Sequence, residues 1–131
     1  MKKTKRSDQT AENFYSALNK LEEFLGEPIV NDRDRAGIIQ AFEFCYELSW
    51  QAIKKLAENE GLDAPTPLQA FQAGFQMKLI PSEAQETWLD MKKSRNLTSH
   101  TYKEEVAEEV LQKINQAYLK AFQDLARTLR R

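Results

Sequence analysis

Residues 31–61, NDRDRAGIIQAFEFCYELSWQAIKKLAENEG, decide the fold. Asn31 and Asp32 are residue types that begin helices, and Gly61 is the type that ends them, so the stretch predicts a single helix. At ~1.5 Å per residue this helix spans about 43 Å. A compact domain of this length has a diameter of only about 36 Å, so we expect an elongated molecule.

The surface of this predicted helix is mostly apolar. With about 100° between successive residues, its polar side chains fall in one narrow strip, formed by Gln40, Glu43, Glu47, Gln51 and Lys54. The apolar side chains that fill most of the rest are Ile38, Ile39, Phe42, Phe44, Cys45, Tyr46, Leu48, Trp50, Ile53 and Leu56. A surface helix ordinarily shows an apolar stripe only somewhat over about 100° wide. This helix is therefore expected to pack on several neighbours, on a second copy of the chain, or on both.

Two shorter helices are predicted around this one. Ser7 or Asp8 can cap a first helix that runs to about Leu25, where Gly26 ends it. After a loop, Thr66 can cap a third helix whose first residue is a proline, a favoured residue at that position.

Two further helices are predicted to begin with capping boxes. Ser82 with Gln85 opens the fourth, and Thr101 with Glu104 opens the last, which should run from Tyr102 to about residue 129. The chain is thus predicted to be all-α: an antiparallel bundle of about five helices with the second and last as its long spine. We expect one domain, residues 7–131, after a flexible basic tail, residues 1–6.

The composition limits the chemistry open to this chain of 131 residues. One cysteine and one histidine exclude an internal disulfide and argue against a zinc site, so we expect no metal and no cofactor. The basic start is not followed by the apolar run of an export signal, and no stretch reaches the ~20 apolar residues of a membrane span. We therefore expect a cytoplasmic protein without a membrane contact. A net charge of −1 excludes a general nucleic-acid coat, so that any RNA contact must be local.

The stretch RNLTSHTY, from Arg95 to Tyr102, joins the last two predicted helices. Arg95 follows Trp88 and Met91 at spacings of seven and four, which places it on the inward stripe of its helix. An unpaired guanidinium on such a face is costly. Arg95 can reach solvent at the helix end, pair with a glutamate, or hold an anionic ligand, and the sequence leaves these alternatives open.

The same stretch holds the groups needed for RNA cleavage by internal transesterification. The imidazole of His100, the only histidine, can move the proton of the 2′-hydroxyl or of the leaving 5′-oxygen. Arg95 can hold the phosphate, and Asn96 can orient either group. Lysines 92, 93 and 103 supply further positive charge for RNA, although lysines are also favoured near the end of a helix by its dipole. No metal is needed for this reaction.

These residues carry a resemblance to a known family. Arg95, His100 and Tyr102 form the motif Arg-x-x-x-x-His-x-Tyr, which resembles the HEPN superfamily of prokaryotic helical-bundle proteins. The full run RNLTSHTY, with FEFCYELSW at 42–50, AFQAGF at 70–75 and WLDM at 88–91, resembles its branch of nucleotidyltransferase substrate-binding proteins. The resemblance covers most of the chain, roughly residues 14–125.

The resemblance implies a helical bundle that forms homodimers, with the two motifs facing a shared cleft. It implies a partner, a small nucleotidyltransferase, often in a toxin–antitoxin pair. In active HEPN toxins the residues matching Arg95 and His100 carry metal-independent endoribonuclease activity, and the residue matching Tyr102 accepts AMP from ATP. A bulky anionic nucleotide on Tyr102 would occupy the phosphate site beside Arg95 and exclude RNA.

Two other functions remain open from the sequence. One is a non-catalytic accessory subunit that binds or presents a substrate to a minimal nucleotidyltransferase. The other is a purely structural helical dimer, in which changes at Arg95 and His100 would alter only stability. The presence of a small nucleotidyltransferase gene next to this one would favour the toxin or the accessory subunit over the structural dimer.

Overall fold

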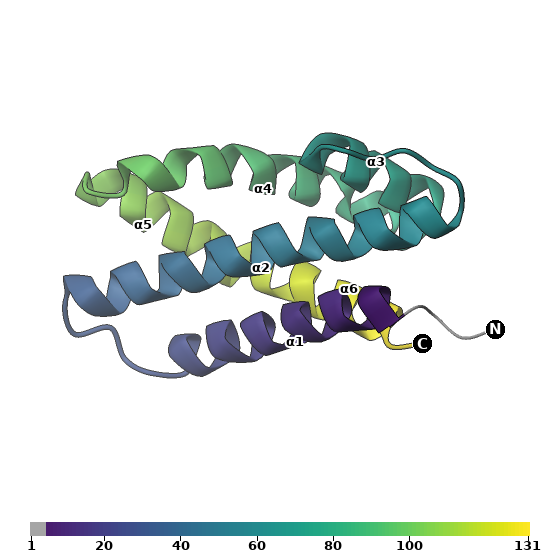
Figure 1. Cartoon of the computed structure of the whole chain (residues 1–131). Coiled ribbons are helices and arrows are strands. Elements are labelled where there is room, and N and C mark those ends of the chain that lie inside the picture. The colour runs from purple at the N-terminus through teal and green to yellow at the C-terminus, as the bar shows by residue number, and fades with distance from the viewer. Residues whose placement is uncertain (1–4) are drawn as a thin grey trace.

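The computed structural model describes residues 5–131, and within that range it contains helices and turns but no strand (Figure 1). The helices are α1 (Lys5–Leu25), α2 (Asp32–Asn59), α3 (Pro67–Gln76), α4 (Gln85–Leu97), α5 (Glu104–Lys113) and α6 (Leu119–Leu129). Two 3₁₀ turns flank α4, and a π-helical turn joins α5 to α6; they are η1 (Ser82–Ala84), η2 (Thr98–His100) and η3 (Ile114–Tyr118). Because α5, η3 and α6 form one continuous rod, the predicted all-α bundle of about five helices is confirmed.

The long helices alternate in direction along the chain, so each lies antiparallel to the next (Figure 1). With 28 residues, α2 spans most of the length of the molecule, which is elongated as its sequence predicts. The rod formed by α5, η3 and α6 runs in the same direction as α2. These two rods are the long spine that the sequence indicates, and α1 and α4 run opposite to them.

Local signals at the ends of α2 work as predicted. The Asn31 side chain accepts a hydrogen bond from the backbone N–H of Asp34 at 3.0 Å, and Asp34 accepts in return from the backbone of Asn31 and Val30. This capping box satisfies N–H groups that the first turn of a helix leaves without partners. At the other end Gly61 takes a φ of 77°, a left-handed conformation that glycine adopts without steric cost. Thr66 caps α3 as predicted.

The two capping boxes predicted from the sequence, Ser82 with Gln85 and Thr101 with Glu104, are wrong. Ser82 lies inside the η1 turn, so α4 begins at Gln85 without a side-chain cap. The hydroxyl of Thr101 donates to the carbonyl of Thr98 at 3.0 Å, and α5 begins at Glu104, two residues later than predicted. In both places a tight turn precedes the helix. At the second, the hydroxyl satisfies a carbonyl of that turn instead of an N–H of the next helix.

The predicted flexible tail falls partly outside the described residues. Helix α1 begins at Lys5, two residues before the predicted cap at Ser7, and residues 1–4 lie outside the described range. Helix α1 ends at Leu25 as predicted, and the N–H of Gly26 donates back to the carbonyl of Glu22 at 3.1 Å.

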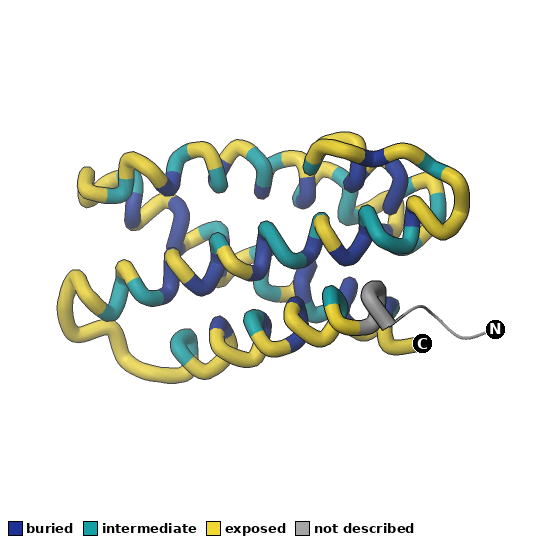
Figure 2. Tube along the Cα trace, in the orientation of Figure 1, coloured by how far each residue is buried: buried dark blue, intermediate teal, exposed yellow. Residues whose placement is uncertain are grey.

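The buried segments of the helices lie on their inner sides (Figure 2). The buried side chains of this core include many aromatic rings. Trp88 of α4, 1% exposed, packs between Phe71 of α3 and Phe122 of α6, with ring centroids 5.2 and 5.6 Å away. Cys45 is fully buried, as expected for a core thiol. Burial, with a smaller contribution from the charge of Glu22, raises the pKa of this thiol to about 12.

A polar network inside the bundle ties α4 to the last rod at the π-helical turn. The Tyr118 hydroxyl lies 2.6 Å from Ser94 Oγ and donates to Asp90 Oδ2 at 2.8 Å. Lys113 also pairs with Asp90, at 3.3 Å. Burial alone would raise the pKa of Asp90, but the hydrogen bonds from Tyr118 and Lys113 outweigh it and hold that pKa below its usual value. The network fixes the position of α4, which carries the candidate site at its far end.

Candidate functional site

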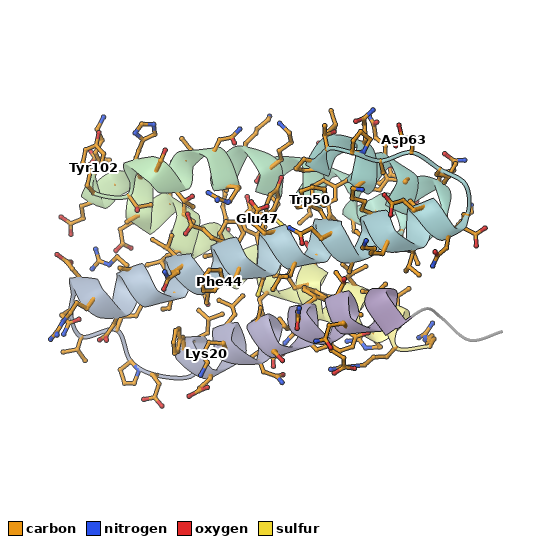
Figure 3. The ribbon with its side chains drawn as sticks, viewed as in Figure 1. Lys20, Phe44, Glu47, Trp50, Asp63 and Tyr102 are labelled. Carbon is orange, nitrogen blue, oxygen red and sulfur yellow. The ribbon has the colours of Figure 1, made fainter. Side chains whose placement is uncertain are left out.

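The residues singled out by the sequence lie at the corner where α4 turns into α5. Arg95 is on the last turn of α4, and His100 ends the η2 turn. Tyr102, which is labelled in Figure 3, lies in the bend before α5. Trp88 and Met91 are buried on the same stripe of α4, which confirms the inward position predicted for Arg95. The corner lies near one end of the elongated bundle.

Arg95 is held by side chains from two elements. Its Nε donates to Glu47 Oε2 at 3.2 Å, and its Nη1 donates to Glu43 Oε2 at 3.2 Å and to Thr98 Oγ1 at 2.9 Å. The Thr98 hydroxyl in turn donates to the backbone carbonyl of Arg95 at 2.7 Å. Of the alternatives that the sequence left open for Arg95, pairing with glutamate is therefore the one that the structure shows.

These contacts leave part of the guanidinium available. An arginine side chain has five N–H donors, and the contacts of Arg95 with Glu43, Glu47 and Thr98 involve only Nε and Nη1. Among the residues that the structure describes, none bonds to Nη2, and the side chain is 33% exposed. Arg95 is therefore fixed in direction and still presents two N–H groups to an incoming oxygen.

Glu47, one of the two glutamates that bind Arg95, is itself held by a hydrogen bond from Trp50. The indole Nε1 of Trp50 donates to Glu47 Oε1 at 2.9 Å, while Glu47 Oε2 binds Arg95. Figure 3 shows Glu47 and Trp50 on the side of α2 that faces α4. Tyr46, one position before Glu47, is buried beneath this group. Burial, together with the charge of Glu47, raises the pKa of its phenol to about 12, against a smaller opposite effect of Arg95.

His100 and Tyr102 are exposed beside one another. Their ring centroids are 6.2 Å apart, the ring planes make an angle of 66°, and Tyr102 is 78% exposed. Both side chains are exposed, so both rings can be reached from solvent. His100 is two residues beyond Thr98, which holds Arg95, so that η2 links the imidazole to the guanidinium.

These groups do not share the groove that opens beside Tyr102. A groove of about 480 Å³ beside Tyr102 is lined by Asp32, Arg35, Ala36, Ile39, Thr101, Tyr102, Glu104 and Ala107. Arg95 does not line it. Of the three residues predicted to line a common pocket, Arg95, His100 and Tyr102, only Tyr102 lines this groove. We call the turn that carries all three, between α4 and α5, the open corner.

Comparison with known proteins assigns the chain to a family. A family model described as nucleotidyltransferase substrate binding protein like matches residues 9–131. The chain belongs to this family. Membership of the nucleotidyltransferase substrate-binding branch of the HEPN superfamily, which the motif at Arg95–Tyr102 indicates, is thereby confirmed.

Two relatives agree with this assignment. A protein of Haemophilus influenzae named probable ribonuclease HepT is 36% identical over 95 residues, which make up 66% of this chain and 62% of that protein. The matched segment thus spans less than two thirds of that relative. A crystal structure from Thermus thermophilus has a TM-score of 0.81 at 28% identity and covers 90% of this chain and 99% of its own.

Not every predicted member of the HEPN site is part of one cluster. Asn96 is exposed beside Arg95, and its backbone carbonyl accepts a bond from Ser99 Oγ at 3.4 Å. The predicted lysine patch is divided, because Lys93 lines a separate hollow with Asp90, away from Arg95. Lys103 is exposed in the bend next to Tyr102.

The sequence reasoning missed the residues that hold Arg95. It identifies Glu43 and Glu47 only as part of the polar strip of α2, and Trp50 only as part of its apolar surface. The sequence does contain a signal for this contact. Two carboxylates one turn apart on a mostly buried helix need cations as partners, and Arg95 is a cation on the inward stripe of its own helix.

In the part of the chain that the structure describes, no group of three or more His, Cys, Asp or Glu side chains is arranged to hold a metal ion. None of the described helices combines the length and the apolar character needed to cross a lipid bilayer.

Proposed function

We propose that this protein is a metal-independent endoribonuclease that acts as a homodimer. It serves as the toxin of a toxin–antitoxin pair and is neutralised when a partner nucleotidyltransferase transfers AMP to Tyr102. The observation that carries the proposal is the corner itself: an anchored guanidinium with Nη2 open lies one turn before an exposed imidazole. The family assignment and the name of the Haemophilus influenzae relative support it.

The proposed reaction needs only groups that this corner offers. The 2′-oxygen of a ribose attacks the adjacent phosphorus, the bond to the 5′-oxygen breaks, and a cyclic phosphate forms. One imidazole takes the proton of the 2′-hydroxyl, and another gives a proton to the 5′-oxygen. A homodimer supplies these two imidazoles, one His100 from each copy. Arg95 stabilises the charge that develops on the phosphate oxygens through Nη2.

Tyr102 is the residue through which we expect this reaction to be controlled by modification. Its oxygen would attack the α-phosphorus of ATP, with loss of its proton and release of pyrophosphate, leaving AMP on the ring. Because the ring lies 6.2 Å from that of His100, the attached nucleotide would lie against the imidazole. Its negative charge would also compete for Arg95 with the RNA phosphate.

RNA cleavage by the purified protein in EDTA tests this proposal. Mass spectrometry of the same sample establishes that Tyr102 is free. We expect the free protein to cut RNA without metal, and to stop cutting after incubation with the partner nucleotidyltransferase and ATP. The Tyr102→Phe variant should escape that inhibition. Absence of cleavage by the unmodified protein would contradict the proposal.

One observation favours a second candidate, a non-catalytic accessory subunit of the nucleotidyltransferase. The positive charge of Arg95 faces two carboxylates, Glu43 and Glu47, which reduce its attraction for an RNA phosphate. An accessory subunit would bind the partner tightly and cut no RNA. The same assay, with a binding measurement on the partner, distinguishes the two functions.

The role of Glu47 can be tested by separating its charge from its hydrogen bonds. Glu47→Gln keeps an oxygen acceptor near Arg95 and removes one negative charge, so KM for RNA should fall about two- to fivefold with kcat little changed. Glu47→Ala frees the guanidinium to move, and a displacement of about 1 Å can cost roughly 100-fold in rate. We therefore expect kcat to fall about 10- to 100-fold in Glu47→Ala. Equal effects of the two variants on kcat would show that Glu47 does not position Arg95.

A further inference from the structure

The outward face of α2 carries an aromatic ring without cover. Phe44 is 52% exposed on the side of α2 that points away from the core, and Figure 3 shows it on the edge toward α1. Leu48, one turn further along, is only partly buried. A large apolar side chain in the middle of a well-packed helix is expected to find a partner.

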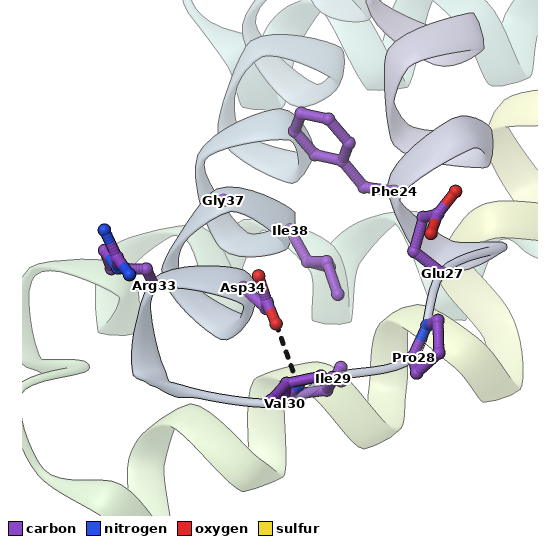
Figure 4. Close-up of a pocket in the computed structure, with 9 residues that line it drawn as sticks. All are labelled: Phe24, Glu27, Pro28, Ile29, Val30, Arg33, Asp34, Gly37 and Ile38. Carbon is purple, nitrogen blue, oxygen red and sulfur yellow. Dashed lines mark hydrogen bonds between the residues drawn. The ribbon is translucent and has the colours of Figure 1, made fainter.

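The same face of α2 carries a hollow two turns earlier. It has a volume of about 440 Å³, and its apolar walls come from Phe24, Ile29, Val30 and Ile38 (Figure 4). Gly37 forms part of its floor, and a side chain added there would meet only the Phe24 ring, at 3.7 Å. Val30, on the rim, is 79% exposed. Because Gly37 has no side chain, a group from outside can approach the backbone of α2 here.

The spacing of the hollow and of the Phe44 ring along α2 is compatible with a twofold axis between two copies of the chain. Seven residues, or about two turns, separate Gly37 from Phe44, so both lie on one face of α2. In an antiparallel pair of identical helices, each residue of one copy faces a fixed residue of the other. A twofold axis that passes between the two α2 helices, level with Gln40 and Ala41, places Phe44 of each copy opposite Gly37 of the other.

From this geometry we infer that two copies of the chain pack α2 against α2 in an antiparallel pair, each inserting Phe44 into the hollow over Gly37 of the other. The inference specifies the interface of the homodimer in the proposed function and rests on it for that dimer's role.

The charged residues on and beside this face of α2 are compatible with the same pairing of Gly37 with Phe44. Arg33 is exposed and lines the hollow, while Glu43 and Glu47 lie beyond the axis on the same helix. When position 37 faces position 44, Arg33 of one copy lies opposite residue 48 and therefore next to Glu47 of the other. The twofold axis repeats this pairing at the other end. Opposite charges thus meet twice, outside the two Phe44 contacts, as expected for the polar rim of an interface.

This interface would also bring the two candidate sites together. Arg95 binds Glu43 and Glu47, which flank Phe44 in sequence. Burying Phe44 against the other copy therefore places both Arg95 side chains beside the contact, on the α4 side of α2. The open corner of each chain then faces the same gap between the copies, which supplies two imidazoles to one substrate.

Disulfide formation between two single variants tests the register. Gly37→Cys fits its own chain, because the added atom makes ordinary contact with Phe24. When Gly37→Cys and Phe44→Cys proteins are mixed under mild oxidation, we expect a covalent dimer of twice the 15.2 kDa mass. Either variant alone should give none, because like positions would lie about 10 Å apart along α2, whereas bridged cysteines have Cα atoms within about 7 Å. Cys45 is buried and should not react.

A second variant guards against a dimer that forms by another face. Phe44→Glu places a charge where the ring should enter an apolar hollow, and we expect sedimentation to show a folded monomer at concentrations where the wild type is a dimer. A dimer that persists in Phe44→Glu, or a mixture that fails to cross-link, would overturn the proposed interface. So would a wild-type monomer whose Phe44 is covered only by the nucleotidyltransferase. None of these readouts depends on RNA cleavage, so a failure here is distinct from a failure of the proposed activity.

Discussion

Replacing His100 with alanine is expected to lower the rate of RNA cleavage in EDTA by roughly 10²- to 10⁴-fold, the usual contribution of a general acid or base. His100 is the only imidazole in the chain, so no neighbouring histidine can replace it. Its side chain is exposed at the end of η2, so truncation should leave the fold intact. The measurement is the initial cleavage rate of a defined RNA, with circular dichroism as a check on folding.

Ser99→Ala is the matched control for this experiment. Ser99 lies in the same turn, is exposed, and makes only a long bond of 3.4 Å to the carbonyl of Asn96. Its removal should change the rate by less than about threefold if the imidazole, rather than the shape of the turn, carries the effect. If His100→Ala cut RNA as fast as this control, the proposed role of the imidazole would be wrong.

Replacing Trp88 with alanine is expected to reduce the free energy of unfolding by about 3–5 kcal/mol, the range for large aromatic side chains removed from a core. Trp88 is 1% exposed and contacts the rings of Phe71 and Phe122, so its loss leaves a cavity between three helices. Urea unfolding followed by circular dichroism measures the change, and an unchanged m value would show that the transition itself is the same.

Leu89→Ala provides the comparison for Trp88→Ala. Leu89 follows Trp88 on α4 but is 38% exposed, so its truncation removes a large apolar side chain from the same helix without opening the core. We expect a cost of less than about 1 kcal/mol. Similar losses in the two variants would mean that the aromatic cluster does not dominate the stability of α4.

The sequence predicts best those features that depend on neighbouring residues in the chain. The predicted helix start at Asn31 and the predicted cap at Thr66 both involve side chains that accept from N–H groups three residues on, and both form. The boxes at Ser82 and Thr101 have the same spacing, yet tight turns before α4 and α5 use those residues differently. Whether a turn intervenes depends on how the helices pack, which a short motif does not record.

In the candidate site, too, the sequence predicts what depends on neighbouring residues and does not predict what depends on how the helices pack. The positions of Arg95, His100 and Tyr102 at one corner follow from the sequence, because all three lie within eight residues. The partners of Arg95 do not, because Glu43 and Glu47 are about 50 residues away in the chain. Their contact depends on the rotation of α2 about its axis relative to α4. The periodicity of either helix gives its own polar strip but not the angle between the two.

The π-helical turn at Ile114–Tyr118 has a consequence for comparing this chain with its relatives. A π turn holds one residue more than an α turn over the same path, so every side chain of α6 is rotated by about 100° relative to a straight continuation of α5. The extra residue puts the Tyr118 hydroxyl on Asp90 and still turns Phe122 into the core. In evolutionary terms this point behaves as an insertion of one residue. A relative with an uninterrupted α-helix here should align only with a single-residue gap, and pairing the sequences without that gap would equate core positions with surface ones throughout α6.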